Sequence, residues 1–296
     1  MKKALFQLHI AVLLAGFTAI LGKLIDLNEG ILVIYRMLLT AIFLGITLQS
    51  SGKLSWPGWA EGKKILGVGA VIAFHWVSFY GSVKYGNISI AVICISGAGF
   101  FSAIFEPILL RQRFYPIEIF LGLLSIAGIL IIFDFHPQYK IGIIFGIFSA
   151  IGSALFPIFN KQLLQRHQPD AITFYEMIGG TVFLLAVLPF YNQLSAAAYW
   201  WPTPTDWLYL LILSLVCTVL CFNLQLNALK KISPFTVNLS YNLEPVYGIL
   251  LAFFFFNENK HLNGYFYLGV LLILLSVALQ MFRVWHKNRF QPTILS

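Results

Sequence analysis

Charge is what this sequence most lacks. Of its 296 residues only 10% are charged, whereas 59% are hydrophobic; a soluble domain carries roughly 25% charged residues. A chain of this length would need more polar surface to face water, so the composition excludes a soluble globular protein and favours one that crosses a membrane several times. The net charge of +8 does not indicate a nucleic-acid partner, because the basic residues fall in the loops between apolar segments.

Signatures of catalysis, ATP use and metal binding are also missing. The sequence has no paired-histidine metal motif and no Gly-x-Ser-x-Gly elbow, so no enzyme activity is expected. The stretch from Gly16 to Lys23 fails as a phosphate loop, because five residues instead of four separate Gly16 from Gly22, and Leu24 stands where Ser or Thr is needed. The three cysteines lie in apolar runs and are interpreted as packing residues. No metal and no cofactor is expected.

What the sequence does contain is ten apolar segments of about 18–24 residues, each able to cross a hydrocarbon core of roughly 30 Å. We therefore predict an all-α integral membrane protein with ten transmembrane helices, five in residues 4–133 and five in residues 141–285. The predicted spans are Ala4–Ile25, Gly30–Gln49, Ile65–Val83, Ile88–Leu110 and Pro116–Phe133, then Ile141–Leu164, Asp170–Tyr191, Trp207–Ala228, Pro234–Phe256 and Asn263–Trp285.

Basic residues divide unevenly between the two sides of the predicted membrane. With the N-terminus inside, the outer side holds Lys23, Lys84, Lys140 and Lys260. The inner side then holds Lys2, Lys3, Lys53, Lys63, Lys64, Arg111, Arg113, Lys161, Arg166, Lys230, Lys231, Arg283, Lys287 and Arg289. This bias follows the positive-inside rule. We predict a multi-pass protein of the inner or plasma membrane with both termini cytoplasmic.

The two halves also resemble each other. Tyr35-Arg36-Met37 and Tyr175-Glu176-Met177 each lie at the start of the second span of their half. Because five is an odd number of spans, the second copy must be inverted relative to the first. Inverted repeats with ionisable residues inside the membrane are typical of secondary transporters, whose substrate sites lie near the bilayer midplane.

Several motifs resemble those of EamA-like proteins of the drug/metabolite transporter superfamily. They are Leu243-Glu244-Pro245-Val246 followed by Asn257-Glu258, Tyr35-Arg36-Met37-Leu38-Leu39, Thr173-Phe174-Tyr175-Glu176 and Tyr80-Gly81-Ser82-Val83-Lys84. The resemblance runs from about Ala4 to Trp285. It implies a ten-helix inverted-repeat fold around a central cavity, and a carrier that exports amino acids, other small metabolites or drugs by exchange or proton coupling. The first copy departs from the pattern, with Gly99 at the position of Pro245 and Gln112 near that of Glu258.

Placing an ionisable residue inside a membrane span costs at least ~2.5–3.5 kcal/mol of insertion free energy, so each such residue is a candidate for a structural or functional role. Glu244 and His75 both lie about ten residues into their spans, near mid-depth. Together they could bind an amino group, relay a proton, or both. The alternative to a transport role for His75 is a structural one, in which a backbone carbonyl satisfies the ring. The alternative for Glu244 is a hydrogen bond that stabilises the helix break at Pro245.

Arg36 and Glu176 enter the membrane from opposite faces, which leaves about 12 Å of depth between them. We predict that they do not touch, that Arg36 serves the outer side and that Glu176 serves the inner side. Arg36 either attracts a substrate carboxylate or is a snorkelling side chain bound to nearby helix ends. Glu106 is expected to form a local ion pair with Arg111 or Arg113.

Polar and aromatic neighbours complete the predicted transport site. Trp76, Tyr80, Tyr175 and Tyr241 flank polar positions and are candidate cavity walls. Pro245 and Pro157 are candidate gating or hinge residues, because proline interrupts the helical hydrogen-bond ladder. The remaining intramembrane amides are expected to join helices by hydrogen bonds: Asn160, Asn223, Gln225, Asn227, Asn238 and Asn242.

The sequence therefore predicts a secondary transporter that exports amino acids or similar small metabolites by alternating access, as a monomer or homodimer in the lipid bilayer. The alternative is a passive facilitator or a membrane sensor with the same fold, since energetic coupling leaves no residue pattern.

Overall fold

A computed structural model describes residues 2–135, 137–194, 200–241, 243–257 and 264–290, and within these ranges every regular element is helical. Asn242, Glu258 and Lys260, singled out above, lie outside the described residues. The first half contains α1 (Lys2–Leu24), α2 (Glu29–Ser50), α3 (Trp59–Tyr85), α4 (Ile88–Ile95), α5 (Ala98–Leu110) and α6 (Pro116–Phe135). The second half contains the short η1 (Pro137–Tyr139), α7 (Lys140–Leu163), α8 (Pro169–Leu194), α9 (Pro204–Ser214), the π-helical η2 (Leu215–Leu220), α10 (Cys221–Leu229), α11 (Pro234–Tyr241), α12 (Glu244–Phe256) and α13 (Gly264–Phe290).

The helices agree with the predicted spans in position. Seven stretches of the described chain are long and apolar enough to cross a membrane, and they coincide with predicted spans one to four and six to eight. Predicted spans five, nine and ten contain shorter apolar helices, at Pro116–Ile131, Tyr247–Phe256 and Gly264–Ser276. The chain is thus a multi-pass, all-helical membrane protein, and the count of ten crossings stays a prediction.

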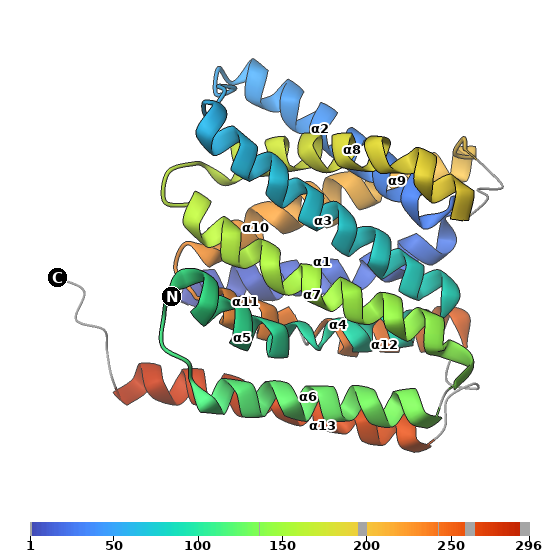
Figure 1. Ribbon diagram of the computed structural model, residues 1–296, viewed down its shortest axis with the longest axis vertical. Coiled ribbons are helices and arrows are strands. Elements are labelled where there is room, and N and C mark those ends of the chain that lie inside the picture. Colours follow the sequence, from blue (N-terminus) through green and yellow to red (C-terminus); the bar gives the residue numbers. More distant parts are fainter. Residues whose placement is uncertain (1, 136, 195–199, 242, 258–263, 291–296) are drawn as a thin grey trace.

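The two halves interlock instead of folding as separate bundles (Figure 1). α1 of the first half packs on α10 and α12 of the second, and α7 of the second half packs correspondingly on α3, α4 and α5 of the first. α2 pairs with α8, and α6 with α13, across the two halves. This exchange of equivalent contacts is what two related five-segment units produce when they pack face to face.

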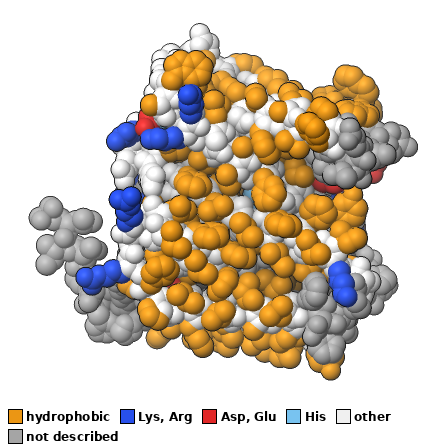
Figure 2. All heavy atoms as spheres, in the orientation of Figure 1, with side chains coloured by type: hydrophobic (Ala, Val, Ile, Leu, Met, Phe, Trp, Pro, Cys, Tyr) orange, Lys and Arg blue, Asp and Glu red, His pale blue; other side chains and the backbone are white. Residues whose placement is uncertain are grey.

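The bundle has one basic end, which we define as the end where α1 begins and α13 ends. Figure 2 shows lysine and arginine side chains gathered along that edge, while apolar side chains cover the broad face between the two ends. The exposed apolar surface includes Ile42, Ile46, Phe120 and Phe254. Such a band suits lipid contact, and the concentration of positive charge at one end follows the pattern of a protein oriented in a membrane.

Two of the predicted spans are broken near their middle. The fourth divides at Ser96 and Gly97 into α4 and α5, and the ninth divides between Tyr241 and Glu244 into α11 and α12. The second break fits Pro245, which lies in the first turn of α12 where proline is tolerated. The first break was not predicted, because Gly99 stands at the matching position. Discontinuous helices in corresponding places of two repeats are a feature of transporter folds.

Glycine allows α3 and α8 to pack backbone to backbone. A Cβ added to Gly69 would lie 2.0 Å from the carbonyl oxygen of Glu176 and 2.8 Å from the backbone nitrogen of Gly180. A Cβ on Gly180 would in turn lie 2.7 Å from the Gly69 carbonyl oxygen. Small residues that let helix backbones approach closely are the usual means of association in lipid. Gly67, on the same helix, has open space where a Cβ would stand.

We expect Gly69→Ala to destabilise the protein by about 1–3 kcal/mol, as overpacking of a close contact does. The matched substitution Gly67→Ala should be neutral, or stabilising by up to about 1 kcal/mol through helix propensity. Thermal unfolding of both variants in detergent, followed by size-exclusion fluorescence, checks the difference. Equal melting temperatures for the two variants would contradict the α3–α8 packing described above.

Candidate functional site

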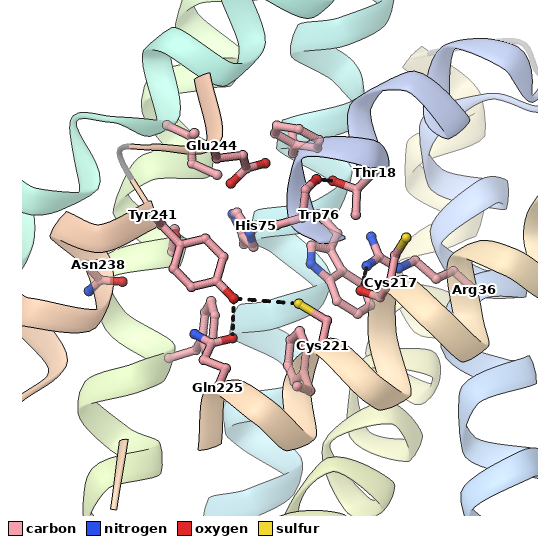
Figure 3. A pocket seen from close by; sticks show the side chains of 16 residues that line it. Thr18, Arg36, His75, Trp76, Cys217, Cys221, Gln225, Asn238, Tyr241 and Glu244 are labelled. Atoms are coloured by element: carbon pink, nitrogen blue, oxygen red, sulfur yellow. Dashed lines mark hydrogen bonds between the residues drawn. The ribbon is translucent and has the colours of Figure 1, made fainter. Parts of the chain in front are cut away.

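A polar cavity lies in the centre of the bundle (Figure 3). Five of the seven predicted transport residues line it: Arg36, His75, Trp76, Tyr241 and Glu244. They come from α2, α3, α11 and α12, so both halves of the chain contribute. The other lining residues are Ala15, Thr18, Phe79, Ile95, Ser153, Phe156, Cys217, Cys221, Phe222, Gln225 and Asn238.

Arg36 is fixed in place at one side of this cavity. Nε donates to Thr218 Oγ1 at 2.8 Å, Nη1 to Tyr80 Oη at 2.8 Å and Nη2 to the Cys217 carbonyl at 3.2 Å. The guanidinium also stacks on Trp76, with Cζ 3.7 Å from the ring centroid. Because a guanidinium has five N–H groups, N–H groups on Nη1 and Nη2 remain for a further acceptor. The side chain is 2% exposed, so it does not snorkel to the surface.

The π-helical segment η2 supplies two of the three hydrogen-bond acceptors of Arg36. Thr218 and Cys217 both belong to it, and Thr218 Oγ1 donates in turn to the Leu213 carbonyl at 2.8 Å. A π-helical turn displaces backbone carbonyls from the regular ladder and is frequently found at functional sites. The segment η2 interrupts the eighth predicted span, which we expected to be continuous. It contains no Pro or Gly from which the interruption could have been predicted.

His75 is anchored through one ring nitrogen. Nδ1 lies 2.8 Å from the Ser149 carbonyl oxygen and 2.9 Å from Ser149 Oγ. For this nitrogen, the alternative that a backbone carbonyl satisfies the ring therefore applies. Nε2 has no hydrogen-bond partner among the described residues. The ring therefore has a fixed orientation and one nitrogen available to the cavity it lines.

α7 carries a second interruption beside His75. Pro157 lies inside the helix and has no N–H for the carbonyl four residues before it, which is that of Ser153. Ser153 lines the cavity, and Asn238 of α11 donates to the adjacent Ala154 carbonyl at 3.4 Å. Pro157 thus adds an acceptor to the cavity wall, while its role as a hinge stays a prediction.

Glu244 opens α12 on the side of the cavity away from Arg36 (Figure 3). It is 3% exposed, and in the described part of the chain it forms neither a hydrogen bond nor an ion pair with Arg36. One turn earlier, Tyr241 Oη donates to Gln225 Oε1 at 3.2 Å and lies 3.6 Å from Cys221 Sγ. The cavity therefore holds a cation and a carboxyl that face the same space without neutralising each other directly.

Aromatic rings form part of the wall of the central cavity. Phe156 and Phe222 stack at 5.8 Å between centroids, and Trp76 meets Phe222 edge-on at 5.6 Å. The cavity volume is about 50 Å³, room for a few water molecules, whereas small-molecule pockets run to roughly 300–1,000 Å³. A metabolite can enter only if the helices around the cavity move apart.

The structure also brings in residues that sequence analysis assigned to packing. Cys217 and Cys221 line the cavity, although their position in an apolar run gave no signal for it. Gln225 and Asn238, interpreted as joining helices, do so and face the cavity as well. The presence of polar amides inside apolar spans was the available signal for these two.

Glu176 and Tyr175 do not reach the central cavity. Glu176 is fully buried on α8, and neither of its carboxylate oxygens has a hydrogen-bond partner in the described chain. It forms neither a hydrogen bond nor an ion pair with Arg36, in agreement with the prediction that the two do not form a salt bridge. Tyr175 Oη donates instead to the Ser55 carbonyl at 3.0 Å, and its ring packs edge-on against Trp56.

The expected local ion pair of Glu106 is wrong. Glu106 Oε2 accepts from the backbone N–H of Phe235 at 2.6 Å, at the first turn of α11. The first N–H groups of a helix lack intrahelical partners and carry partial positive charge, so a buried carboxylate satisfies them. Arg111 and Arg113 follow in the exposed connection after α5.

A second, larger cavity of about 720 Å³ opens at the basic end, and we call it the end cavity. Its polar lining comes from the connections before α3 and α8, from the first two turns of α8 and from the half-buried face of α10: Lys53, Ser55, Arg166, His167, Gln168, Asp170, Tyr175, Asn223 and Asn227. α10 separates it from the central cavity, because Asn223 and Asn227 face one space while Phe222 and Gln225 face the other.

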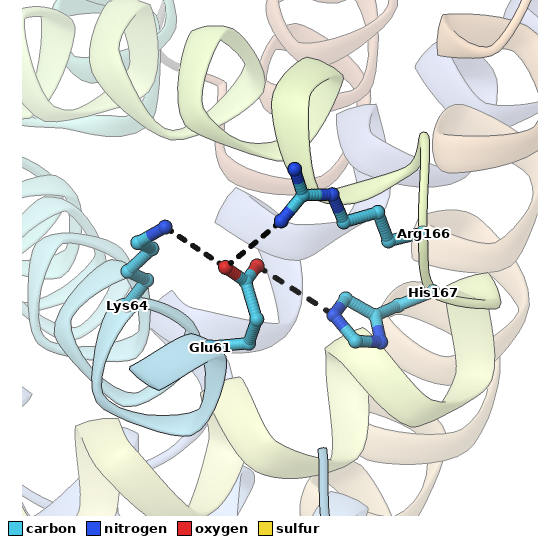
Figure 4. A network of polar contacts seen from close by, with 4 residues as sticks. All are labelled: Glu61, Lys64, Arg166 and His167. Atoms are coloured by element: carbon cyan, nitrogen blue, oxygen red, sulfur yellow. Dashed lines mark hydrogen bonds and ion pairs between the residues drawn. The ribbon is translucent and has the colours of Figure 1, made fainter. Parts of the chain in front are cut away.

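A polar network ties the rim of the end cavity together (Figure 4). Glu61 Oε1 lies 2.9 Å from Lys64 Nζ and 3.3 Å from Arg166 Nη1, and Oε2 lies 3.7 Å from His167 Nε2. This network joins the start of α3 to the connection between α7 and α8. Its members at the surface are well solvated, so each pair adds at most about 1 kcal/mol.

Comparison with known proteins gives a consistent result. The model of the EamA-like transporter family matches residues 2–134 and again residues 140–282. An "Uncharacterized transporter YetK" of Bacillus subtilis is 26% identical over 267 residues, 84% of this chain and 78% of that protein. Two proteins of Archaeoglobus fulgidus, each named "Uncharacterized transporter", are 26% and 28% identical over 140 and 135 residues, and the match spans about half of their length (48%).

One solved crystal structure aligns with 94% of this chain and 96% of its own, with a TM-score of 0.66 at 15% identity. The likeness shows a shared fold.

We expect Arg36→Gln to destabilise the protein strongly. It would leave Tyr80, Thr218 and the Cys217 carbonyl without their partner, at a cost of about 1–3 kcal/mol for each buried group left unsatisfied. Arg166→Gln makes the same change in the solvated Glu61 network, and it should lower the free energy of unfolding by no more than about 1 kcal/mol. Melting of both variants in detergent is the measurement, and a similar loss in both would show that the contacts of Arg36 do not stabilise the fold.

Proposed function

Because the chain belongs to the EamA-like transporter family, we propose that it is a secondary transporter that exports amino acids, or similar small metabolites with both an amino and a carboxyl group, by alternating access. The observation that carries this proposal is the central cavity with Arg36 on one side and Glu244 on the other. A passive facilitator would share the fold and differ only in coupling.

The two charges suit a zwitterion. A substrate carboxylate would accept hydrogen bonds from the free N–H groups of Arg36. The planar guanidinium is well shaped to donate two parallel hydrogen bonds to a carboxylate. A substrate ammonium would donate to Glu244 and to the nearby Tyr241 or Gln225. Because both protein groups are already desolvated, a ligand that satisfies both gains more than one that satisfies a single charge.

The aromatic wall would take the side chain of the substrate. Phe156, Phe222 and Trp76 line the same cavity as the two charges, pack against one another and offer apolar contact to the substrate. This favours neutral amino acids of small or medium size over those with a second charge. His75, which also lines the cavity, would contact the substrate or a bound water through Nε2.

The end cavity supports a cytoplasmic entrance. It lies at the basic end, which the positive-inside rule assigns to the cytoplasm, and only α10 separates it from the central cavity. Opening between α10 and the α3–α8 pair would join the two spaces and admit a substrate from inside. Resealing there, with opening on the far side, would complete export.

Transport of labelled amino acids by the purified protein in liposomes tests the proposal. We expect neutral amino acids to exchange across the membrane, and a pH gradient either to drive net uptake or to leave it unchanged, which separates proton coupling from pure exchange. Net flux of the amino acid down its own concentration gradient, with neither a pH gradient nor a counter-substrate, would indicate a facilitator. No flux of any amino acid would remove the proposed substrate class.

Glu244→Gln should raise the half-saturation concentration for a transported amino acid by about 10–100-fold, the effect of losing one charge-assisted hydrogen bond of roughly 1.5–3 kcal/mol. Inhibition by the N-acetyl derivative, which lacks the ammonium group, should not change. Glu118→Gln, which removes a carboxylate paired with Arg283 at 3.1 Å outside both cavities, serves as the control and should transport normally. An equal effect of Glu244→Gln on both compounds would exclude Glu244 as the ammonium site.

A further inference from the structure

Glu176 is a buried carboxyl that the proposed substrate site does not use. It is fully buried in α8 and lines neither the central cavity nor the end cavity. Neither carboxylate oxygen has a hydrogen-bond partner in the described chain. An ionised carboxylate without a partner in such a place costs several kcal/mol, so in this packing the group is a neutral acid that keeps its proton.

The polar group that faces Glu176 is the amide of Asn160 on α7. Asn160 is also fully buried, and neither its amide nitrogen nor its amide oxygen has a hydrogen-bond partner among the described residues. A carboxylic acid and an amide are complementary, since each can donate one hydrogen bond and accept another. Here they stand close together without hydrogen-bond geometry, and two unsatisfied buried groups are a cost that an apolar pair would avoid.

Charged and titratable groups on the surrounding helices do not neutralise Glu176. α8 packs on α3, α2 and α10, and α10 carries no charged residue. Among the titratable side chains of these elements and of α7, Lys63, Tyr85 and Lys140 are exposed, and Glu29 lies in the first turn of α2. The others are engaged elsewhere: Tyr35 with the Trp200 carbonyl, Arg36 with Thr218, Glu61 with Lys64, His75 with Ser149, Tyr80 with Arg36, Lys84 with the Ile25 carbonyl, Lys161 with the Ile232 carbonyl, Asp170 with Asn223, Tyr175 with the Ser55 carbonyl and Cys221 with the Ala11 carbonyl.

We propose that Glu176 is the proton-binding site of the transport cycle, separate from the substrate cavity, with Asn160 as its hydrogen-bond partner in one of the two alternating states. The inference rests on the proposed transport function. It assigns proton coupling to the α3–α7–α8 contact, whereas Arg36 and Glu244 bind the substrate.

Access to water follows from the position of Glu176 on its helix. Tyr175, the preceding residue, lines the end cavity, and adjacent residues of a helix point about 100° apart. A rotation of α8 with loosening of its contact at Gly69 would turn the Glu176 carboxyl into the end cavity. There the acid releases its proton to water and becomes a solvated carboxylate. Return to the packed state requires that the carboxylate take up a proton again. In the proposed cycle that proton comes from the opposite side of the membrane, in the other of the two alternating states, so one proton crosses the membrane in each cycle.

Infrared spectroscopy of the wild-type protein in lipid tests the protonation of Glu176 without any substrate. We expect a carbonyl stretch of a protonated carboxylic acid, at the high frequency of a group without hydrogen bonds, that is lost in Glu176→Gln and kept in Glu118→Gln. If Glu176→Gln does not fold, Glu176→Asp, which keeps the acid in a shorter side chain, should shift the same band. A band unchanged by substitution at Glu176 would overturn the proposal.

Transport in liposomes tests the coupling. Glu176→Gln, which cannot release a proton, should lose uptake driven by a pH gradient down to the level of protein-free liposomes, while exchange of labelled for unlabelled amino acid at equal pH continues. Asn160→Ala should shift the pH at which exchange is fastest. Uptake still driven by the gradient in Glu176→Gln, or loss of exchange together with it, would refute the assignment. Failure of the substrate proposal is seen separately, as absence of exchange by the wild-type protein.

Discussion

The hydrogen-bonding demand of the backbone in lipid is the constraint on which this structure depends. No polar backbone group can face hydrocarbon unsatisfied, so a helix may be interrupted only where protein or an internal cavity supplies partners. The breaks between α4 and α5 and between α11 and α12, the π-helical η2 and Pro157 of α7 all obey this rule. Ile95, Tyr241, Cys217 and Ser153, which lie at or next to these four irregular places, all line the central cavity. The positions of the irregularities and of the site therefore have one cause.

Much of the fold could be predicted from the sequence, because long apolar runs and short connections leave a chain in lipid few choices. The limits Ile88 and Leu110 of the fourth predicted span coincide with the start of α4 and the end of α5. Interior irregularities were harder to predict. Pro245 indicated the break in the ninth span, but the fourth breaks at Ser96 and Gly97 without a proline, and η2 has no sequence signal because packing around Arg36 selects it.

The candidate site shows a similar limit. Counting residues along a span gives depth, and depth placed Glu244 and His75 at one level, where they indeed share a cavity. Rotation about the helix axis is not given by depth, and Glu176 turns its carboxyl away from the cavity for that reason. Glu106 shows the effect of distant partners, since the N–H group that it binds belongs to Phe235, 129 residues further along the chain. A local reading of charge could not have found it.

The two halves are similar in layout yet unequal in detail. The π-helical η2 occurs in the eighth predicted span, while α3, the corresponding span of the first half, is continuous. Arg36 takes two of its three hydrogen-bond acceptors from η2. If the halves exchange conformations during a cycle, the site seen from one side of the membrane is not a mirror image of the site seen from the other. Such a carrier is kinetically sided: without substrate it rests mainly in one orientation, and the concentration that half-saturates it differs between its two faces.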